Sequence, residues 1–128
     1  MVILKKLILD IRGFSLIEIL IVLAIIGILL TIAVPNLFKA EEAARKRATE
    51  LEMRGIIASI YNYRLSTYSL PVSLKDLVNE GYIKSSALVD EWGTDYKFEV
   101  KNNKVVITSA GPDKRFGTKD DIVVEENF

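Results

Sequence analysis

The hydrophobic residues of this chain are concentrated near its N-terminus. Residues 14–34, FSLIEILIVLAIIGILLTIAV, contain one charged residue, Glu18, and their apolar side chains would cover every face of a helix. A helix rises about 1.5 Å per residue, so roughly 20 apolar residues cross a hydrocarbon layer of about 30 Å. The pattern therefore predicts a membrane-spanning helix that carries an unexplained acid.

Beyond Pro35 the sequence becomes a mixture of charged, apolar and alanine residues. These are good helix formers, so we expect the helix to continue from about 36 to about 65, with two apolar faces at helical spacing. The bulky face, expected to pack in a domain core, consists of Met53, Ile56, Ile57, Ile60 and Tyr63, joined by Phe38. The alanine stripe on the other side consists of Ala33, Leu37, Ala40, Ala44, Ala48 and Leu51. The stripe either lets neighbouring copies approach closely or reflects only the helix propensity of alanine.

Shorter elements are predicted in the C-terminal half. Ser73 and Asp76 have the spacing of a capping box and Gly81 is a stop signal, so a short helix is expected over 74–80. A tight turn is expected at Asn102–Asn103. Alternating residues predict strands over 96–100, 104–108 and 122–124. The predicted class is α+β, a long N-terminal helix, membrane-spanning in its first half, packed on a small antiparallel sheet.

Composition excludes several classes of function. The 17 basic and 17 acidic residues give a net charge of zero, so no nucleic-acid partner is expected. There is no cysteine and no histidine, which excludes disulfides, zinc sites built from these residues and a catalytic triad with a histidine base. Phosphate-binding and hydrolase motifs are also missing, and we expect no enzyme activity.

The apolar segment follows a short leader that carries Lys5, Lys6 and Arg12. Basic residues beside a span favour the cytoplasmic side, so the domain after the span is expected across the membrane. A secretory signal peptide, cleaved near Ala33, and an uncleaved signal anchor are two interpretations of this arrangement. Neither interpretation explains Glu18, because a carboxylate inside a membrane span raises the free energy of insertion by about 2.5–3.5 kcal/mol.

A third interpretation gives Glu18 a purpose. If the leader is removed between Gly13 and Phe14, the new α-amine lies four residues before Glu18, on the same face of the helix. With a pKa of about 7.7–8.0 the amine is largely cationic near neutrality, so it can neutralise Glu18 within the chain or in a neighbouring copy. Glu18 would then set the register between assembling subunits.

This N-terminal sequence resembles the prepilin motif of type IV pilins and type II secretion pseudopilins: Gly13-Phe14-Ser15-Leu16-Ile17-Glu18 after a short basic leader. The resemblance implies a prepilin peptidase that cuts before Phe14 and methylates its amine, and assembly from the inner membrane into a homo-oligomeric helical filament. The segments that it implies are a prepilin leader, 1–13, a transmembrane and filament-core helix, 14–35, and a stalk helix with a periplasmic globular domain, 36–128.

Three later blocks resemble the major pseudopilin of type II secretion: LPVSLKDLVNEGYIKSS, EWGTDYKFEV and SAGPDKRFGTKDDI. The resemblance implies a periplasmic fibre that works with minor pseudopilins and an inner-membrane assembly platform to drive proteins across the outer membrane. The sequence departs from the family at Asp95, where proline is frequent. In the same block, Trp92 is expected to anchor the domain core.

The last block carries three acids, Asp113, Asp120 and Asp121, in a glycine-containing loop. On spacing alone a polar surface turn is the simpler interpretation, because the EF-hand pattern is missing. The pseudopilin resemblance implies instead a structural calcium ion held by these three aspartates, with a carbonyl of Ala110 and an oxygen of Thr118.

Two alternatives remain for the basic residues of this loop, and three functions are considered for the whole chain. Lys114, Arg115 and Lys119 can neutralise the acids without a metal, or point outward. The chain is expected to be a pseudopilus subunit, and the alternative is the major subunit of a surface type IV pilus, which shares the N-terminal motif. A function of a different class is a membrane-anchored calcium-binding module that never polymerises.

Overall fold

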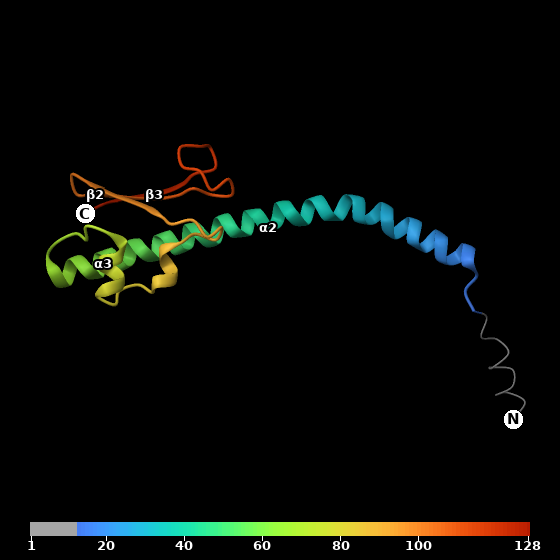
Figure 1. Ribbon diagram of the computed structural model, residues 1–128, viewed down its shortest axis with the longest axis horizontal. Helices are drawn as coiled ribbons and strands as arrows, with labels where there is room; N and C mark the ends of the chain where they lie inside the picture. The colour runs from blue at the N-terminus through green and yellow to red at the C-terminus, as the bar shows by residue number, and fades with distance from the viewer. Residues whose placement is uncertain (1–12) are drawn as a thin grey trace, which may run out of the picture. The chain divides into compact units, whose positions relative to one another are not determined.

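The computed structural model describes residues 13–128, so the leader with its basic residues lies outside the described residues except for Gly13. The chain divides into two compact units, one ending at Lys39 and the other comprising Ala40–Phe128. One helix, α2 (Leu16–Thr67), has residues in both and includes Pro35 (Figure 1). The prediction of a helix that continues past Pro35 is confirmed, and the helix ends two residues later than expected.

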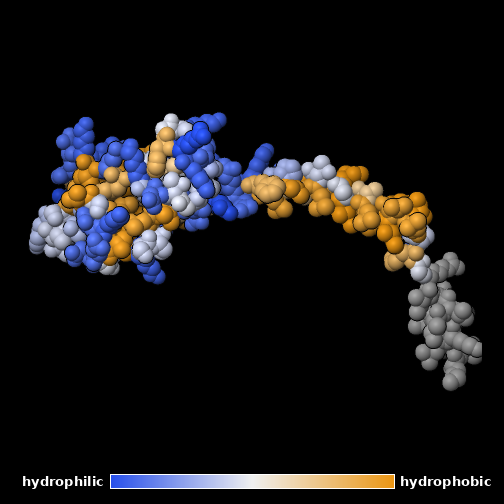
Figure 2. Space-filling model, in the orientation of Figure 1, coloured by the Kyte–Doolittle hydropathy of each residue, from blue (hydrophilic) through white to orange (hydrophobic). Residues whose placement is uncertain are grey.

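In the first unit, helix α2 is covered with apolar side chains that the unit does not bury. Ile26 is 44% exposed and Leu16 is 77% exposed. The same segment, blue to cyan in Figure 1, is mostly orange on the face shown in Figure 2. Among residues 13–128, α2 is the one helix long and apolar enough, by length and composition, to cross a membrane. An apolar surface of this size requires lipid or other apolar surfaces to cover it.

The second unit contains the remaining elements in the order α3 (Leu74–Asn79), η1 (Ser85–Leu88), β1 (Lys97–Lys101), β2 (Lys104–Ser109) and β3 (Ile122–Asn127). The strands form one antiparallel sheet in the order β1-β2-β3. The predicted class, α+β, is therefore confirmed. Strand β3 is longer than the predicted 122–124, because its polar second half pairs with β2 as far as Asn127. The 3-10 helix η1 was not expected, since four residues are too few to show a helical period.

The start of α3 and the turn between β1 and β2 are fixed by local interactions, as the sequence indicated. The Asp76 carboxylate accepts hydrogen bonds from the backbone N–H of Val72 and of Ser73, both at 3.0 Å, and so holds the start of α3. Asn102 and Asn103 have φ values of 51° and 62°, as a two-residue type I′ hairpin turn requires. The hairpin between β1 and β2 is therefore set by these two asparagines.

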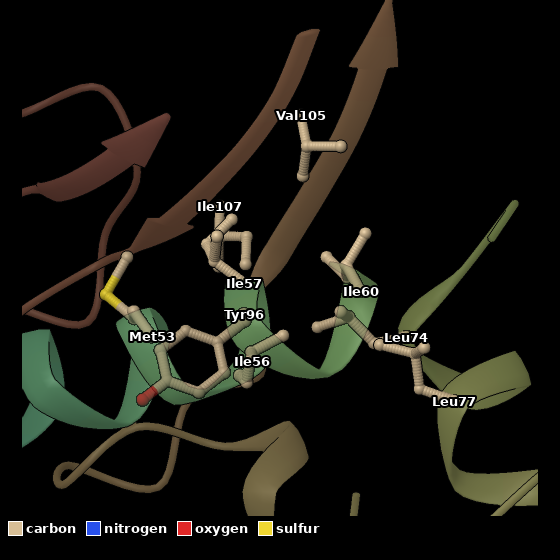
Figure 3. Close-up of a cluster of buried hydrophobic side chains, with 9 residues drawn as sticks. All are labelled: Met53, Ile56, Ile57, Ile60, Leu74, Leu77, Tyr96, Val105 and Ile107. Carbon is tan, nitrogen blue, oxygen red and sulfur yellow. The ribbon is translucent and has the colours of Figure 1, made fainter. Parts of the chain in front are cut away.

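The core of the second unit lies between α2 and the inner face of the sheet. Figure 3 shows Val105 and Ile107 pointing from β2 towards Met53, Ile57 and Ile60 of α2. The whole buried cluster consists of Met53, Ile56, Ile57, Ile60, Leu74, Leu77, Tyr96, Val105 and Ile107. The predicted bulky face of the helix is thus the core face, with Tyr63 partly buried beside it.

Two aromatic residues were wrongly placed by the sequence interpretation. Phe38 is 66% exposed and belongs to the first unit, which ends before the domain core begins. Trp92 is half-buried and is not part of the core cluster. Tyr96 fills that position instead, and its hydroxyl donates to the Glu52 carboxylate of α2 at 2.9 Å. Burial first, and then the hydrogen bond to Glu52, raise the pKa of the Tyr96 phenol.

The outer face of the sheet is largely exposed and mostly polar, with Val106 and Val123 among its charged residues. On β1 it carries Lys97, Glu99 and Lys101, with opposite charges alternating along the strand. Lys97 and Glu99 approach to 3.3 Å, and Lys104 of β2 pairs with Glu125 of β3 at 2.8 Å. Because β1 is an edge of the sheet, these charges flank its unpaired backbone groups.

Candidate functional site

The expected cleavage position lies just before helix α2. Residues 13–15 have no regular secondary structure, and both Gly13 and Phe14 are exposed, Phe14 by 81%. A peptidase must bind its substrate in an extended form, so a bond outside any helix is open to it. The backbone here suits cleavage between Gly13 and Phe14.

Glu18 and Ser15 form a reciprocal pair at the start of the helix. The Ser15 N–H donates to the Glu18 Oε2 at 3.2 Å, and the Glu18 N–H donates to the Ser15 Oγ at 3.3 Å. This is a capping box, which satisfies two backbone donors that the first helical turn leaves without partners. The sequence interpretation missed this capping box, although the Ser-x-x-Glu spacing that indicates it is present at residues 15–18.

The pairing of Glu18 with an α-amine stays a prediction, since the Phe14 nitrogen is a peptide amide in this chain. The capping box uses the Oε2 of Glu18. Among the hydrogen bonds of residues 13–128 none involves the Oε1 of Glu18, so one carboxylate oxygen remains for a further donor.

The second half of α2 presents a charged surface with internal ion pairs. Glu41 pairs with Arg45 at 2.9 Å and Glu42 with Lys46 at 3.3 Å, each pair four residues apart on the helix. These side chains are about half exposed, and such pairs contribute only about 0.3–0.5 kcal/mol each. The alanine stripe is also exposed, with Leu51 70% exposed at its end. Its packing against other copies stays a prediction.

The predicted ion site is the connection between β2 and β3, which we call the aspartate loop (residues 110–121). Asp113 accepts hydrogen bonds from the Arg115 N–H at 2.9 Å and from the Thr118 hydroxyl at 2.6 Å. The Gly117 N–H donates to the Asp121 Oδ2 at 2.8 Å. Two of the three acids and Thr118 are therefore ordered by one turn of the loop.

The two ordered carboxylates differ in how well they are satisfied. The hydrogen bond from Thr118, followed by that from the Arg115 backbone, lowers the pKa of Asp113. The Oδ1 of Asp121 is buried and has no hydrogen-bond partner. An unpartnered buried carboxylate oxygen is unfavourable, so this atom is the place in the loop where a cation would be stabilising.

The structure does not draw all three acids together. Within residues 13–128 no three acidic side chains lie close enough to hold a metal ion. Of the two alternatives for the basic residues, ion pairing is not seen: none of the ion pairs found within the described part of the chain involves Lys114, Arg115 or Lys119. Within the described residues, none of these three basic side chains therefore forms an ion pair with a carboxylate of the loop.

The beginning of the aspartate loop is tightly packed. Ala110 is fully buried, and Gly111 follows it with φ of +73°, a conformation that favours glycine. A Cβ atom at position 111 would collide with the backbone carbonyl of Asp120. The two ends of the loop therefore touch, and the backbone of Ala110 is held where the chain of Asp120 returns.

Comparisons with known proteins match both parts of the chain. The family model described as "Prokaryotic N-terminal methylation motif" matches residues 10–34, and the model "Type II secretion system (T2SS), protein G" matches residues 36–125. No solved structure matches the chain.

Curated relatives agree with the second of these models. The type II secretion system core protein G of Escherichia coli (strain K12) is 34% identical over 129 residues, covering 87% of this chain and 88% of the relative. That of Pectobacterium carotovorum subsp. carotovorum is 33% identical, covering 87% of this chain and 82% of the relative. The competence protein ComGC of Bacillus subtilis (strain 168) is 39% identical over 77 residues, covering 60% of this chain and 79% of the relative. The chain belongs to the protein G family of the type II secretion system, the major pseudopilins, which are structural subunits and not enzymes.

Proposed function

We propose that this chain is anchored in the bacterial inner membrane by a single span, with its C-terminal domain in the periplasm, and is then assembled into a pseudopilus that drives protein export across the outer membrane. The leader (residues 1–13) is removed, residues 14–35 form the core of the filament, and residues 36–128 form the stalk and globular domain. The partners are further copies of the chain, a prepilin peptidase, minor pseudopilins and the inner-membrane assembly platform.

The observation that carries this proposal is the uncovered apolar surface of α2 in the first unit. A soluble domain would bury such residues, yet Leu16 and Leu29 are 77% and 60% exposed. Lipid covers this surface before assembly, and the same segments of neighbouring copies cover it afterwards. The match to the N-terminal methylation motif over residues 10–34 supports processing at the start of this segment.

Mass spectrometry of the chain isolated from its native membrane tests the proposal. We expect a mature N-terminus at Phe14, with one added methyl group on its amine, because the Gly13–Phe14 bond lies exposed before the helix. A chain that retains residues 1–13 in an assembled filament would contradict the proposal.

We further propose that the aspartate loop binds one calcium ion with a structural role. Its donors are all oxygens, as calcium prefers, and the buried Oδ1 of Asp121 lacks any other partner. Asp113, Asp120 and Asp121 would supply carboxylates, Ala110 a backbone carbonyl and Thr118 an oxygen. The bound ion would supply positive charge that ties the two ends of the loop together. Since three acids do not converge without it, the side chains must turn towards Asp121 on binding.

Removal of calcium is expected to lower the melting temperature of the chain in detergent micelles. A ligand at one hundred times its Kd stabilises the folded state by about 2.7 kcal/mol, which corresponds to roughly 10 °C for a domain of this size. Differential scanning calorimetry with excess calcium and with chelator measures the difference. Asp121→Asn should abolish it, whereas Asp95→Asn, an exposed acid outside the loop, should not. Identical melting curves of the unmodified chain in both buffers would rule out the ion site.

A further inference from the structure

A buried acid outside the aspartate loop organises the chain around it. Asp90 is only 5% exposed, and no basic side chain forms an ion pair with it within the described residues. Its Oδ1 accepts hydrogen bonds from the backbone N–H of Trp92 at 3.0 Å and of Thr94 at 2.9 Å. Its Oδ2 accepts a hydrogen bond of 2.6 Å from the hydroxyl of Ser109. Both oxygens of the Asp90 carboxylate therefore accept hydrogen bonds, one from the loop of residues 92–94 and the other from Ser109.

Ser109 continues this chain of hydrogen bonds into the aspartate loop. It is fully buried at the end of β2, and its Oγ accepts a hydrogen bond from the Gly111 N–H at 3.2 Å. The bond spans Ala110, so it fixes the peptide groups on both sides of that residue. Asp90, by accepting the hydroxyl proton of Ser109, orients the Ser109 oxygen towards Gly111.

The residue after Asp90, Glu91, connects the same loop to helix α2. The Glu91 N–H donates a hydrogen bond to the Oγ1 of the fully buried Thr49 at 3.4 Å. The Arg45 guanidinium donates to the Glu91 carbonyl, also at 3.4 Å. Hydrogen bonds from α2 thus reach Glu91, and its covalent neighbour Asp90 is hydrogen-bonded through Ser109 to the beginning of the aspartate loop.

We propose that Asp90 and Ser109 are positioning residues for the ion site: they hold the backbone of Ala110 ready to accept a calcium ion, and they transmit its binding to the loop of Trp92 beside α2. This inference rests on the proposed calcium site. Residues that orient metal ligands without touching the metal typically change affinity by about 10–100-fold when they are replaced.

The single tryptophan of the chain provides a direct readout. The backbone N–H of Trp92 donates a hydrogen bond to Asp90, so a change transmitted through Ser109 reaches the environment of Trp92. The full-length chain in detergent micelles is titrated with calcium, while calorimetry records ion binding and fluorescence records Trp92 emission. We expect both signals to saturate together in the unmodified chain.

Ser109→Ala is expected to raise the Kd for calcium by about 10–100-fold and to abolish the change in emission at saturation. Ser109→Thr, which keeps the hydroxyl, should restore both signals, and Ser86→Ala, at an exposed serine, should leave both unchanged. Asp90→Asn is a second variant, because it keeps the acceptor for Trp92 but loses the carboxylate that accepts from Ser109. Its control is Asp95→Asn.

The outcomes separate the two proposals. Calcium binding to Ser109→Ala and Asp90→Asn with unchanged affinity and unchanged emission would overturn the positioning role and leave the ion site intact. If calorimetry detects calcium binding to the unmodified chain but the Trp92 emission does not change, the proposed transmission of binding to the loop of Trp92 is overturned. A purely structural role predicts lower melting temperatures with unchanged Kd, and would also overturn the inference. If calorimetry detects no binding to the unmodified chain, the ion site itself fails and this inference falls with it.

Discussion

Cells that carry Glu18→Gln are expected to lose their pseudopilus filaments, although the chain still inserts into the membrane. The substitution removes the negative charge that we propose to pair with the α-amine of Phe14, while it preserves the size of the side chain. A loss of about 1.4 kcal/mol at each subunit contact lowers the association constant tenfold, and a filament repeats this loss at every subunit. Electron microscopy of sheared fibres should show a reduction of about tenfold or more.

This variant separates the two roles of Glu18. A glutamine at the third helical position can still accept the Ser15 N–H, so the capping box remains. Ser15→Ala has the opposite effect, because it removes the hydroxyl that accepts the Glu18 N–H but leaves the charge. If the charge directs assembly, Glu18→Gln prevents filament growth and Ser15→Ala does not.

Glu41→Gln is the matched control for Glu18→Gln. It makes the same chemical change in the same helix, at an exposed position paired only with Arg45. Filaments should form normally in this control. Filaments of normal number and length in Glu18→Gln would show that the acid acts through the capping box, or not at all.

The second large effect is expected in the core of the globular unit. Ile60 is fully buried and belongs with Leu74 and Leu77 of α3 to the core cluster shown in Figure 3. Ile60→Ala removes three carbon atoms and leaves a cavity, which costs about 2–5 kcal/mol. Native domains are stable by only about 5–15 kcal/mol, so the melting temperature should fall by about 10 °C or more. Thermal unfolding followed by far-ultraviolet circular dichroism measures the change.

Leu51→Ala is the control for the core substitution, since Leu51 lies in the same helix but is 70% exposed. Its melting temperature should stay within about 2 °C of the unmodified chain, because exposed substitutions usually change stability by less than about 0.5 kcal/mol. Equal effects at both positions would mean that α2 does not pack on the sheet as described.

Much of the fold could be predicted because its determinants are local. The helix through Pro35, the start of α3 at Ser73 and the turn at Asn102–Asn103 each follow from a few neighbouring residues. Phe38 and Trp92 were misplaced because their burial depends on where the second unit begins and on Tyr96, which are properties of the tertiary structure.

The candidate sites were predictable only in part, for the same reason. Glu18 was recognisable as an isolated charge among apolar residues, and the acids of the aspartate loop by their resemblance to a family. The role of Asp90 was not, because its partner Ser109 lies 19 residues away and meets it only when β2 forms. Nothing in the spacing of these two residues indicates that the Ser109 hydroxyl donates a hydrogen bond to Asp90.

The charged edge strand β1 has a consequence for the polymer. In a fibre the globular units of many copies stand at very high local concentration, and bare strand edges at that density would join into the continuous sheets of amyloid. Lys97, Glu99 and Lys101 lie on the exposed face of the edge strand β1, where a second copy of this strand would bring like charges opposite one another in some registers. In the proposed filament the charged strand β1 therefore disfavours joining of the sheets of neighbouring subunits.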